Sequence, residues 1–126
     1  MKKIIQTEKA PAAIGPYSQA ILVQDNLIYT AGQIPLDPQS GELLNSTIEE
    51  ATSRVLDNLK AVLEAAGSSI DKVIKTTVFM TNLSEFAQMN EIYATYFGEN
   101  PPARSAVQVA ALPKGARIEI EAVALK

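Results

Sequence analysis

The chain has 126 residues, of which 47% are hydrophobic and 20% are charged. This size and composition fit one compact domain and exclude a two-domain enzyme or a TIM barrel. The sequence contains neither cysteine nor histidine. Disulfides, thiolate nucleophiles, Ser-His-Asp triads and Cys- or His-ligated metals are therefore excluded. Any chemistry must use carboxylates, Lys, Arg, Tyr, hydroxyls and backbone groups.

The charge pattern restricts the partners of the protein. Eleven Lys and Arg against fourteen Asp and Glu give a net charge of −3, and Lys2-Lys3 is the only adjacent basic pair. The sequence thus lacks the basic patch typical of a nucleic-acid binder. No apolar run approaches the roughly 18 residues of a membrane span, and none follows Lys2-Lys3 as in a signal peptide. We expect a cytoplasmic protein with no nucleic-acid or membrane partner.

Three short strands are predicted in the first part of the chain, from apolar, β-rich runs at Lys2–Gln6, Gln19–Val23 and Leu27–Ile34. Gln24-Asp25-Asn26 has turn-forming residues and predicts a hairpin between the second and third strands. Within the third run, Gly32 indicates a bulge or a close approach of a ligand to the backbone. Pro35 to Gly41 has the composition of an ordered surface loop.

Two helices are predicted from apolar residues spaced by three or four. The first covers Ser46–Ala66, with Ser46 and Glu49 as a capping box and Gly67 at the C′ position. The second follows Asn82 as N-cap and ends before Gly98. Its apolar face consists of Phe86, Met89, Tyr93, Tyr96 and Phe97.

Three further strands are predicted, at Val73–Met80, Arg104–Val109 and Arg117–Leu125. The element order predicts a single α+β domain over residues 1–126, a two-layer sandwich with two helices on one face of a mixed β-sheet. The other face of the sheet would lack helical cover. If that face is apolar, it requires another subunit.

The last strand carries two carboxylates that could act as general acid or base. Glu119 and Glu121 alternate onto the same strand face as Val123 and Leu125. Partial desolvation there would raise a carboxyl pKa and suit it to proton transfer. Spacing alone favours a plainer interpretation, a solvated strand end or an ion pair with Arg117.

Arg104 and Asn90 are further candidates. Arg104 follows the stiff Pro101-Pro102 pair, and its guanidinium could bind a carboxylate in a bidentate way. A structural ion pair is the alternative. Asn90 shares a helix face with aromatic residues and must find hydrogen-bond partners, for which the backbone of a neighbouring loop is the common solution. Tyr17, in a Gly-Pro-Tyr-Ser turn, is a weak candidate by itself.

Six segments in order along the whole chain resemble the conserved blocks of the Rid (YjgF) family, in its RidA branch of 2-iminobutanoate/2-iminopropanoate deaminases. They are Ala10-Pro-Ala-Ala-Ile-Gly-Pro-Tyr-Ser-Gln19, Ala31-Gly-Gln-Ile-Pro35, Lys75-Thr-Thr-Val-Phe79, Asn90 with Tyr93, Pro102-Ala-Arg-Ser105 and Ile118-Glu-Ile-Glu-Ala122. The resemblance implies a chorismate-mutase-like fold and a homotrimer whose sheets line a barrel, with ligand clefts between subunits. It also implies hydrolysis of small 2-imino acids to 2-keto acids and ammonia. Because imines hydrolyse readily, we expect this reaction to require no metal or redox cofactor.

The resemblance also implies roles for individual residues. Arg104 would bind the substrate carboxylate, and Glu119 would position and deprotonate the attacking water. The substrate site would be lined or contacted by Tyr17, Gly32, Asn90 and the backbone of Ala106.

The sequence departs from the RidA branch at two of these positions. Ala106 replaces a frequent Cys and Ala31 a frequent Ser. A backbone contact at 106 survives the first change, whereas any side-chain hydroxyl contact at 31 is lost. Two other functions remain open. The protein could be a non-catalytic regulatory protein that binds small carboxylates, or an RNA-acting translation inhibitor, which the acidic charge disfavours.

Overall fold

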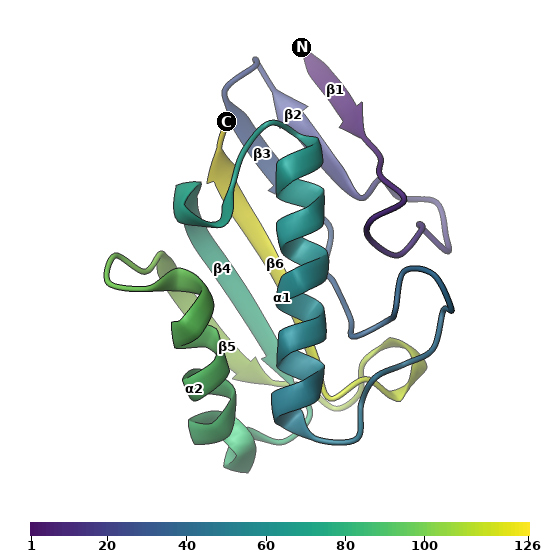
Figure 1. Cartoon of the computed structure of the whole chain (residues 1–126), viewed down its shortest axis with the longest axis vertical. Helices are drawn as coiled ribbons and strands as arrows, with labels where there is room; N and C mark the ends of the chain where they lie inside the picture. Colours follow the sequence, from purple (N-terminus) through teal and green to yellow (C-terminus); the bar gives the residue numbers. More distant parts are fainter.

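The computed structural model describes residues 1–126 as one six-stranded sheet with two main helices (Figure 1). In chain order these elements are β1 (Lys2–Ile5), β2 (Ala20–Val23), β3 (Leu27–Thr30), α1 (Ile48–Ala65), β4 (Val73–Met80), α2 (Phe86–Phe97), β5 (Ala103–Gln108) and β6 (Ile118–Leu125). Three short 3₁₀ helices that the sequence patterns did not predict complete the chain, at Ile70–Lys72, Leu83–Glu85 and Pro113–Gly115.

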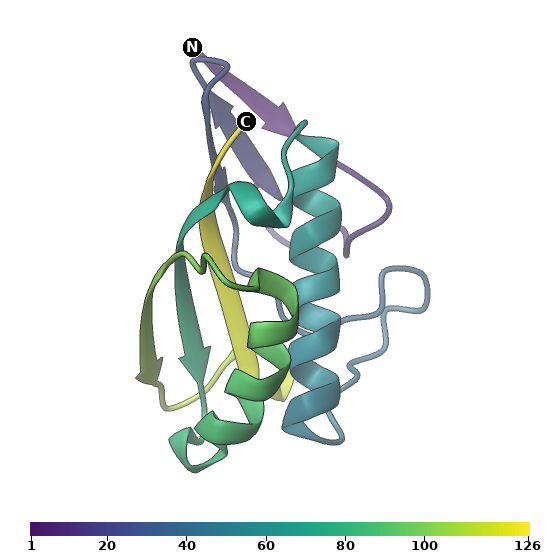
Figure 2. The ribbon, with the colours of Figure 1, turned by 60° about the vertical axis from the view of Figure 1, so that its left-hand side comes forward.

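The sheet has the strand order β1-β2-β3-β6-β4-β5. All neighbouring strands are antiparallel except β4 and β5, which are parallel, so the predicted mixed sheet is confirmed. Both helices lie on the same face of the sheet (Figure 2), which confirms the predicted two-layer arrangement. Neither helix has the length and apolar composition needed to cross a bilayer.

The main core lies between this sheet face and the helices. The apolar stripe predicted for the first helix is buried along α1, through Ile48, Ala51, Val55, Leu56, Leu59, Val62 and Leu63. It packs with the inward-facing residues of the central strand β6, namely Ile118, Ile120, Ala122 and Ala124. Burial of these side chains, at about 25 cal/mol per Å² of apolar surface, is the main force that holds the helices to the sheet.

The opposite face of the sheet carries no helix; we call it the open face. The odd-numbered residues of β6 point to it, so Glu119 and Glu121 share a face as predicted. Large apolar side chains are exposed there, including Tyr29 (49%), Leu125 (43%) and Val107 (43%). A sheet face of this kind is typical of a surface covered in an assembly.

Both helix starts differ slightly from the predicted caps. The N-cap of α1 is Thr47, whose side chain accepts a hydrogen bond from the Glu50 amide, so the predicted Ser46–Glu49 capping box is wrong by one residue. Thr47 is the N-cap because its hydroxyl reaches the third amide of a helix that begins at Ile48. Asn82 is an N-cap as predicted, but it caps the 3₁₀ turn that leads into α2. Gly67 lies just past α1 with φ +86°, as expected for C′.

The third predicted strand, Leu27–Ile34, is interrupted: β3 ends at Thr30. Tyr29 pairs with Val123 of β6, but the next pair along the two strands is Gln33 with Ile120. Three residues, 30–32, therefore face two residues of β6, which defines a β-bulge. The Thr30 hydroxyl accepts the Ala122 amide at 3.0 Å and so replaces a backbone bond of the ladder. The bulge predicted at Gly32 is confirmed.

Replacing Thr30 with Val should destabilise the fold, because the partly buried Ala122 amide would lose its acceptor. An unsatisfied donor of this kind costs about 1–3 kcal/mol. Thr30→Ser retains the hydroxyl and serves as the control. Denaturant unfolding of the three proteins measures the difference; equal stability of the Val and Ser variants would contradict the role of this bond.

Candidate active site

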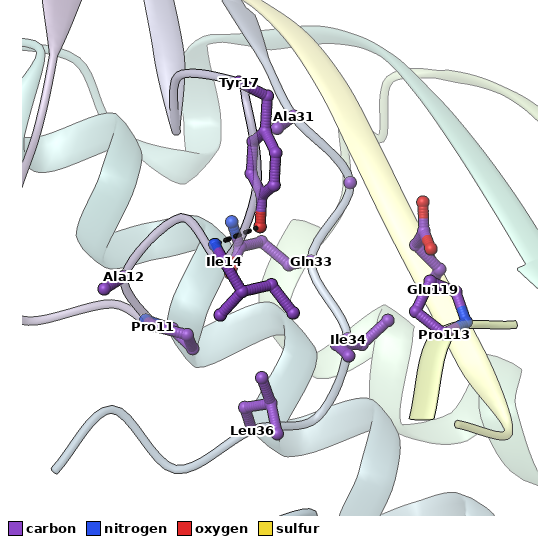
Figure 3. A pocket seen from close by; sticks show the side chains of 11 residues that line it. Pro11, Ala12, Ile14, Tyr17, Ala31, Gln33, Ile34, Leu36, Pro113 and Glu119 are labelled. Atoms are coloured by element: carbon purple, nitrogen blue, oxygen red, sulfur yellow. Dashed lines mark hydrogen bonds between the residues drawn. The ribbon is translucent and has the colours of Figure 1, made fainter. Parts of the chain in front are cut away.

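A pocket of about 260 Å³ opens beside Glu119 on β6. Figure 3 shows the Tyr17 ring on one side of the pocket and the Glu119 carboxyl on the other. The wall between them is mostly apolar and comes from three separate loops; it comprises Pro11, Ala12, Ile14, Ala31, Gly32, Gln33, Ile34, Leu36 and Pro113. The fold thus brings Tyr17, Gly32 and Glu119, three of the predicted site residues, together.

The loop between β1 and β2 forms the Tyr17 side of this pocket. The buried amide of Gln19 fastens the loop: its Nε2 donates to the Thr7 and Pro11 carbonyls at 3.0 and 2.8 Å, and its Oε1 accepts from the Thr7 amide at 2.7 Å. The Tyr17 hydroxyl accepts a long hydrogen bond, 3.4 Å, from the Ile14 amide. The ring and hydroxyl of Tyr17 are therefore held at the pocket while still half exposed.

The Glu119 carboxyl has a raised pKa and no hydrogen-bond partner within the chain. Burial raises the pKa of its half-buried carboxyl above the ordinary value, and the negative charge of Glu121 raises this pKa further. No hydrogen bond within the chain offsets these two effects. The alternative interpretation, an ion pair with Arg117, is wrong, because the Arg117 guanidinium binds Glu85 at 2.9 Å instead. Glu119 is therefore a carboxylate available to a ligand or a water.

Arg104, on the edge strand β5, is oriented by residues of α2. Its Nη1 donates to the Asn90 side-chain oxygen at 2.8 Å, and its Cζ lies 4.7 Å from the Tyr93 ring centre and 5.1 Å from that of Phe86. Tyr93 is itself fixed by a 2.7 Å hydrogen bond to Thr76. Stacking on aromatic faces and one hydrogen bond leave the other guanidinium nitrogens free for an anion.

Asn90 and Arg104 do not have the structural partners that the sequence alone suggested, a loop backbone for Asn90 and an ion pair for Arg104. Asn90 bonds the Arg104 side chain rather than the backbone of a loop, and Arg104 forms no salt bridge. A groove of about 430 Å³ runs beside the guanidinium. It is lined by Asn90, Tyr93, Ala94, Phe97, Gly98, Pro101, Pro102 and Arg104.

One chain does not bring Arg104 and Glu119 together. Arg104 pairs with Thr76, a buried residue of the helix-covered face, and its guanidinium lies over α2. Glu119 pairs with Phe79 on the open face, two strands away from β5. The pocket and the groove share no residue. The two side chains could act on one small molecule only if a second copy completes the site.

Ala106 lies on β5 beside Val78, with its side chain packed against the main core. It lines neither the pocket nor the groove. Because β5 pairs only with β4, one row of its backbone amides and carbonyls faces outward at the sheet edge. A ligand contact at Ala106 would use this backbone row.

Sequence reasoning did not find Asn58, which shapes the pocket wall from behind. This fully buried side chain donates from Nδ2 to the carbonyls of Ile34 and Leu36, at 3.3 and 2.9 Å, and accepts from Arg54. Its only signal in the sequence is a polar residue within the apolar stripe of the first helix. No group of three or more carboxylates gathers that could hold a metal ion.

Comparison with known proteins identifies relatives along the whole chain. The profile of the Endoribonuclease L-PSP family matches residues 7–126. A RutC family protein of Pyrococcus abyssi is 56% identical over 125 residues, which cover 99% of this chain and 98% of the relative. A 2-iminobutanoate/2-iminopropanoate deaminase of Rattus norvegicus is 54% identical over 126 residues, which cover 100% of this chain and 91% of that protein.

The fold agrees with these sequence matches. The crystal structure of a candidate endoribonuclease from Thermotoga maritima superposes with a TM-score of 0.96 at 56% sequence identity, covering 100% of this chain and 98% of the other. Since both the sequence and the fold match over the full length, this chain belongs to the Endoribonuclease L-PSP (YjgF/Rid) family.

Proposed function

We propose that the protein hydrolyses small 2-imino acids, such as 2-iminobutanoate and 2-iminopropanoate, to 2-keto acids and ammonia. Relatives named 2-iminobutanoate/2-iminopropanoate deaminase, such as the Rattus norvegicus protein, support this class of substrate. The proposal rests above all on Glu119, a half-buried carboxylate with a raised pKa and no partner within the chain, at the edge of a small pocket.

In the proposed reaction Arg104 binds the substrate carboxylate through its free nitrogens, while Asn90 and the aromatic rings keep the guanidinium in place. Glu119 accepts a proton from water as the water oxygen bonds to the imine carbon, and this proton passes to the imine nitrogen. In the resulting carbinolamine the hydroxyl proton moves to the amine as the carbon–nitrogen bond breaks, which releases ammonia and leaves the keto acid. Orientation and proton transfer suffice for this reaction, so it requires no metal or redox cofactor.

The remaining predicted residues would complete the substrate site. Tyr17 would close one side of the pocket and Gly32 would lie beside the reacting carbon, while the backbone at Ala106 would bond the substrate carboxylate from the edge of β5. The apolar wall of the pocket suits the aliphatic side chain of such a substrate.

The site is proposed to form between the subunits of a homotrimer. Arg104 and Glu119 lie on opposite faces of the sheet, so two chains are needed to place them around one molecule. The apolar open face, with Tyr29, Val107 and Leu125 exposed, supports an assembly that covers it. The particle in solution should have about three times the chain mass of 13.5 kDa.

Two alternative functions, non-catalytic carboxylate binding and action on RNA, would give results different from those of imine hydrolysis. A non-catalytic protein could use the same Arg104 groove to bind small carboxylates, and it would bind keto acids without accelerating hydrolysis. An RNA-acting protein is suggested by the family description. The net charge of −3 and the lack of a basic stripe in the sequence argue against it, because phosphate binding favours a basic surface.

The proposed activity is tested directly with imines generated in situ by an amino-acid oxidase from several aliphatic amino acids. The protein should accelerate the release of ammonia and keto acid over the uncatalysed rate. An unchanged rate for every imine, together with measurable binding of keto acids, would instead establish the non-catalytic alternative.

The two glutamates of β6 form a matched pair for the catalytic role. Glu119→Gln should lower kcat/KM about 100- to 10,000-fold, the range for loss of a general base, whereas Glu121→Gln should retain most of the turnover. Since Glu119 acts in its ionised form, kcat/KM should rise with pH through its elevated pKa. Glu121→Gln removes a neighbouring negative charge and should move this acidic limb to lower pH.

Kinetic pH profiles of the wild type and both variants provide the measurement. An inactive, well-folded Glu121→Gln protein beside an active Glu119→Gln protein would show that the roles of the two carboxylates are reversed.

Co-assembly of two inactive variants tests whether the site is shared. Trimers that mix Arg104→Ala and Glu119→Gln chains should regain activity, because a site between an unaltered Arg104 and an unaltered Glu119 forms once in each mixed ring. Random mixing of the two chains makes about three quarters of the trimers mixed. Each mixed trimer has one intact site out of three, so the whole preparation should have about a quarter of the wild-type activity.

Differently tagged chains allow the mixed trimers to be purified after co-expression, and each variant assembled alone is the control. Mixed trimers as inactive as both parents would show that Arg104 and Glu119 of one chain serve the same site.

A further inference from the structure

Gly32 lies unusually close to the Glu119 side chain. A Cβ atom at position 32 would be 2.0 Å from Glu119 Oε2, 2.7 Å from Cδ and 2.9 Å from Cγ. Unstrained contacts between such atoms are about 3.5–4.0 Å, so a methyl group and the carboxyl cannot occupy this space together. The other glycines differ: a Cβ at Gly15 would make an ordinary 3.7 Å contact, and one at Gly98 would meet nothing within 4 Å.

The backbone at Gly32 does not itself require a glycine. The positive-φ glycines of the chain are Gly41, Gly67, Gly98 and Gly115, and Gly32 is not among them. Gly32 therefore does not adopt the left-handed backbone conformation that favours glycine. The close approach of the Glu119 carboxyl is the physical reason for a residue without a side chain.

The β-bulge directs position 32 toward Glu119. If the pairing of Tyr29 with Val123 continued without a bulge, Gly32 would lie opposite Ile120, whose side chain is buried under the helices. The extra residue shifts the register by one, so that Gln33 pairs with Ile120. Gly32 then faces the open side of the sheet, where it is a diagonal neighbour of Glu119.

We infer that Gly32 is a positioning residue, whose missing side chain forms the recess that holds the Glu119 carboxyl against the backbone of the bulge. This recess fixes the direction of the carboxyl toward the pocket and shields one side of it from water. The catalytic consequence rests on the proposed imine hydrolysis, but the steric fit of the two residues does not. The role differs from the ligand contact that the family resemblance implies for Gly32.

The steric part is tested by a double-mutant cycle in unfolding free energy, which needs no activity. Gly32→Ala should destabilise the wild-type protein but have little effect in a Glu119→Ala background, where the carboxyl, Cδ and Cγ that it would meet are gone. Gly15→Ala is the matched control and should cost the same in both backgrounds. An equal cost of Gly32→Ala in both backgrounds would overturn the inference, and the Glu119→Ala background keeps the test valid if Gly32→Ala alone fails to fold.

The positioning part is tested by NMR titration of the Glu119 carboxyl, assigned with Glu119→Gln, and by kinetics. In Gly32→Ala the displaced carboxyl should be more hydrated, so its pKa should fall toward the ordinary value, and kcat should fall about 100-fold, as for a 1 Å misplacement. Because Gly32 also lines the pocket, binding of the product 2-oxobutanoate should weaken, but by a smaller factor than kcat falls. Weakened binding with an unchanged Glu119 pKa and kcat would instead assign Gly32 to ligand contact.

These results separate the inference from the proposed function. If the wild type does not hydrolyse imines but the double-mutant cycle shows the coupling, only the proposed function fails. If the wild type is active and Gly32→Ala shows neither the stability coupling nor the pKa change, only the inference fails.

Discussion

The strict alternation of side chains along β6 is the constraint on which the rest of the structure depends. β6 is a central strand, paired with β3 on one side and β4 on the other. Its even-numbered residues complete the core under the helices, and this burial fixes its orientation, because a shift by one residue would place Glu119 and Glu121 in the core. The position of the catalytic candidate is therefore a consequence of hydrophobic packing.

The same alternation separates the two candidate functional groups. Arg104 lies on the face covered by α2, where aromatic rings and Asn90 hold its guanidinium. Glu119 lies on the open face, where partial burial raises its pKa. Because they lie on opposite faces, Arg104 and Glu119 of one chain cannot form an ion pair with each other. Within the chain, both groups therefore stay free to bind a ligand.

The pocket depends on polar side chains that lie behind its apolar wall. Gln19 fastens the loop that carries Tyr17, Asn58 binds the carbonyls of the 34–36 segment, and Thr30 supports the bulge. Each satisfies backbone groups that the irregular segments cannot pair among themselves. These loops can therefore be ordered without belonging to the sheet, and their order gives the pocket a defined shape.

The sequence by itself determined the two main helices and the six strands apart from their exact ends, the two-layer architecture and the shared face of Glu119 and Glu121, because these follow from local periodicity of two or 3.6 residues. The motif resemblance named Tyr17, Gly32 and Arg104, yet periodicity could not show that Glu119 lies against Gly32 or that Asn90 bonds Arg104. Only the tertiary structure decided these contacts, because they join segments distant in the chain and depend on a one-residue shift between β3 and β6. Sequence patterns describe neighbours along one strand or helix, whereas register and packing between elements decide which side chains meet.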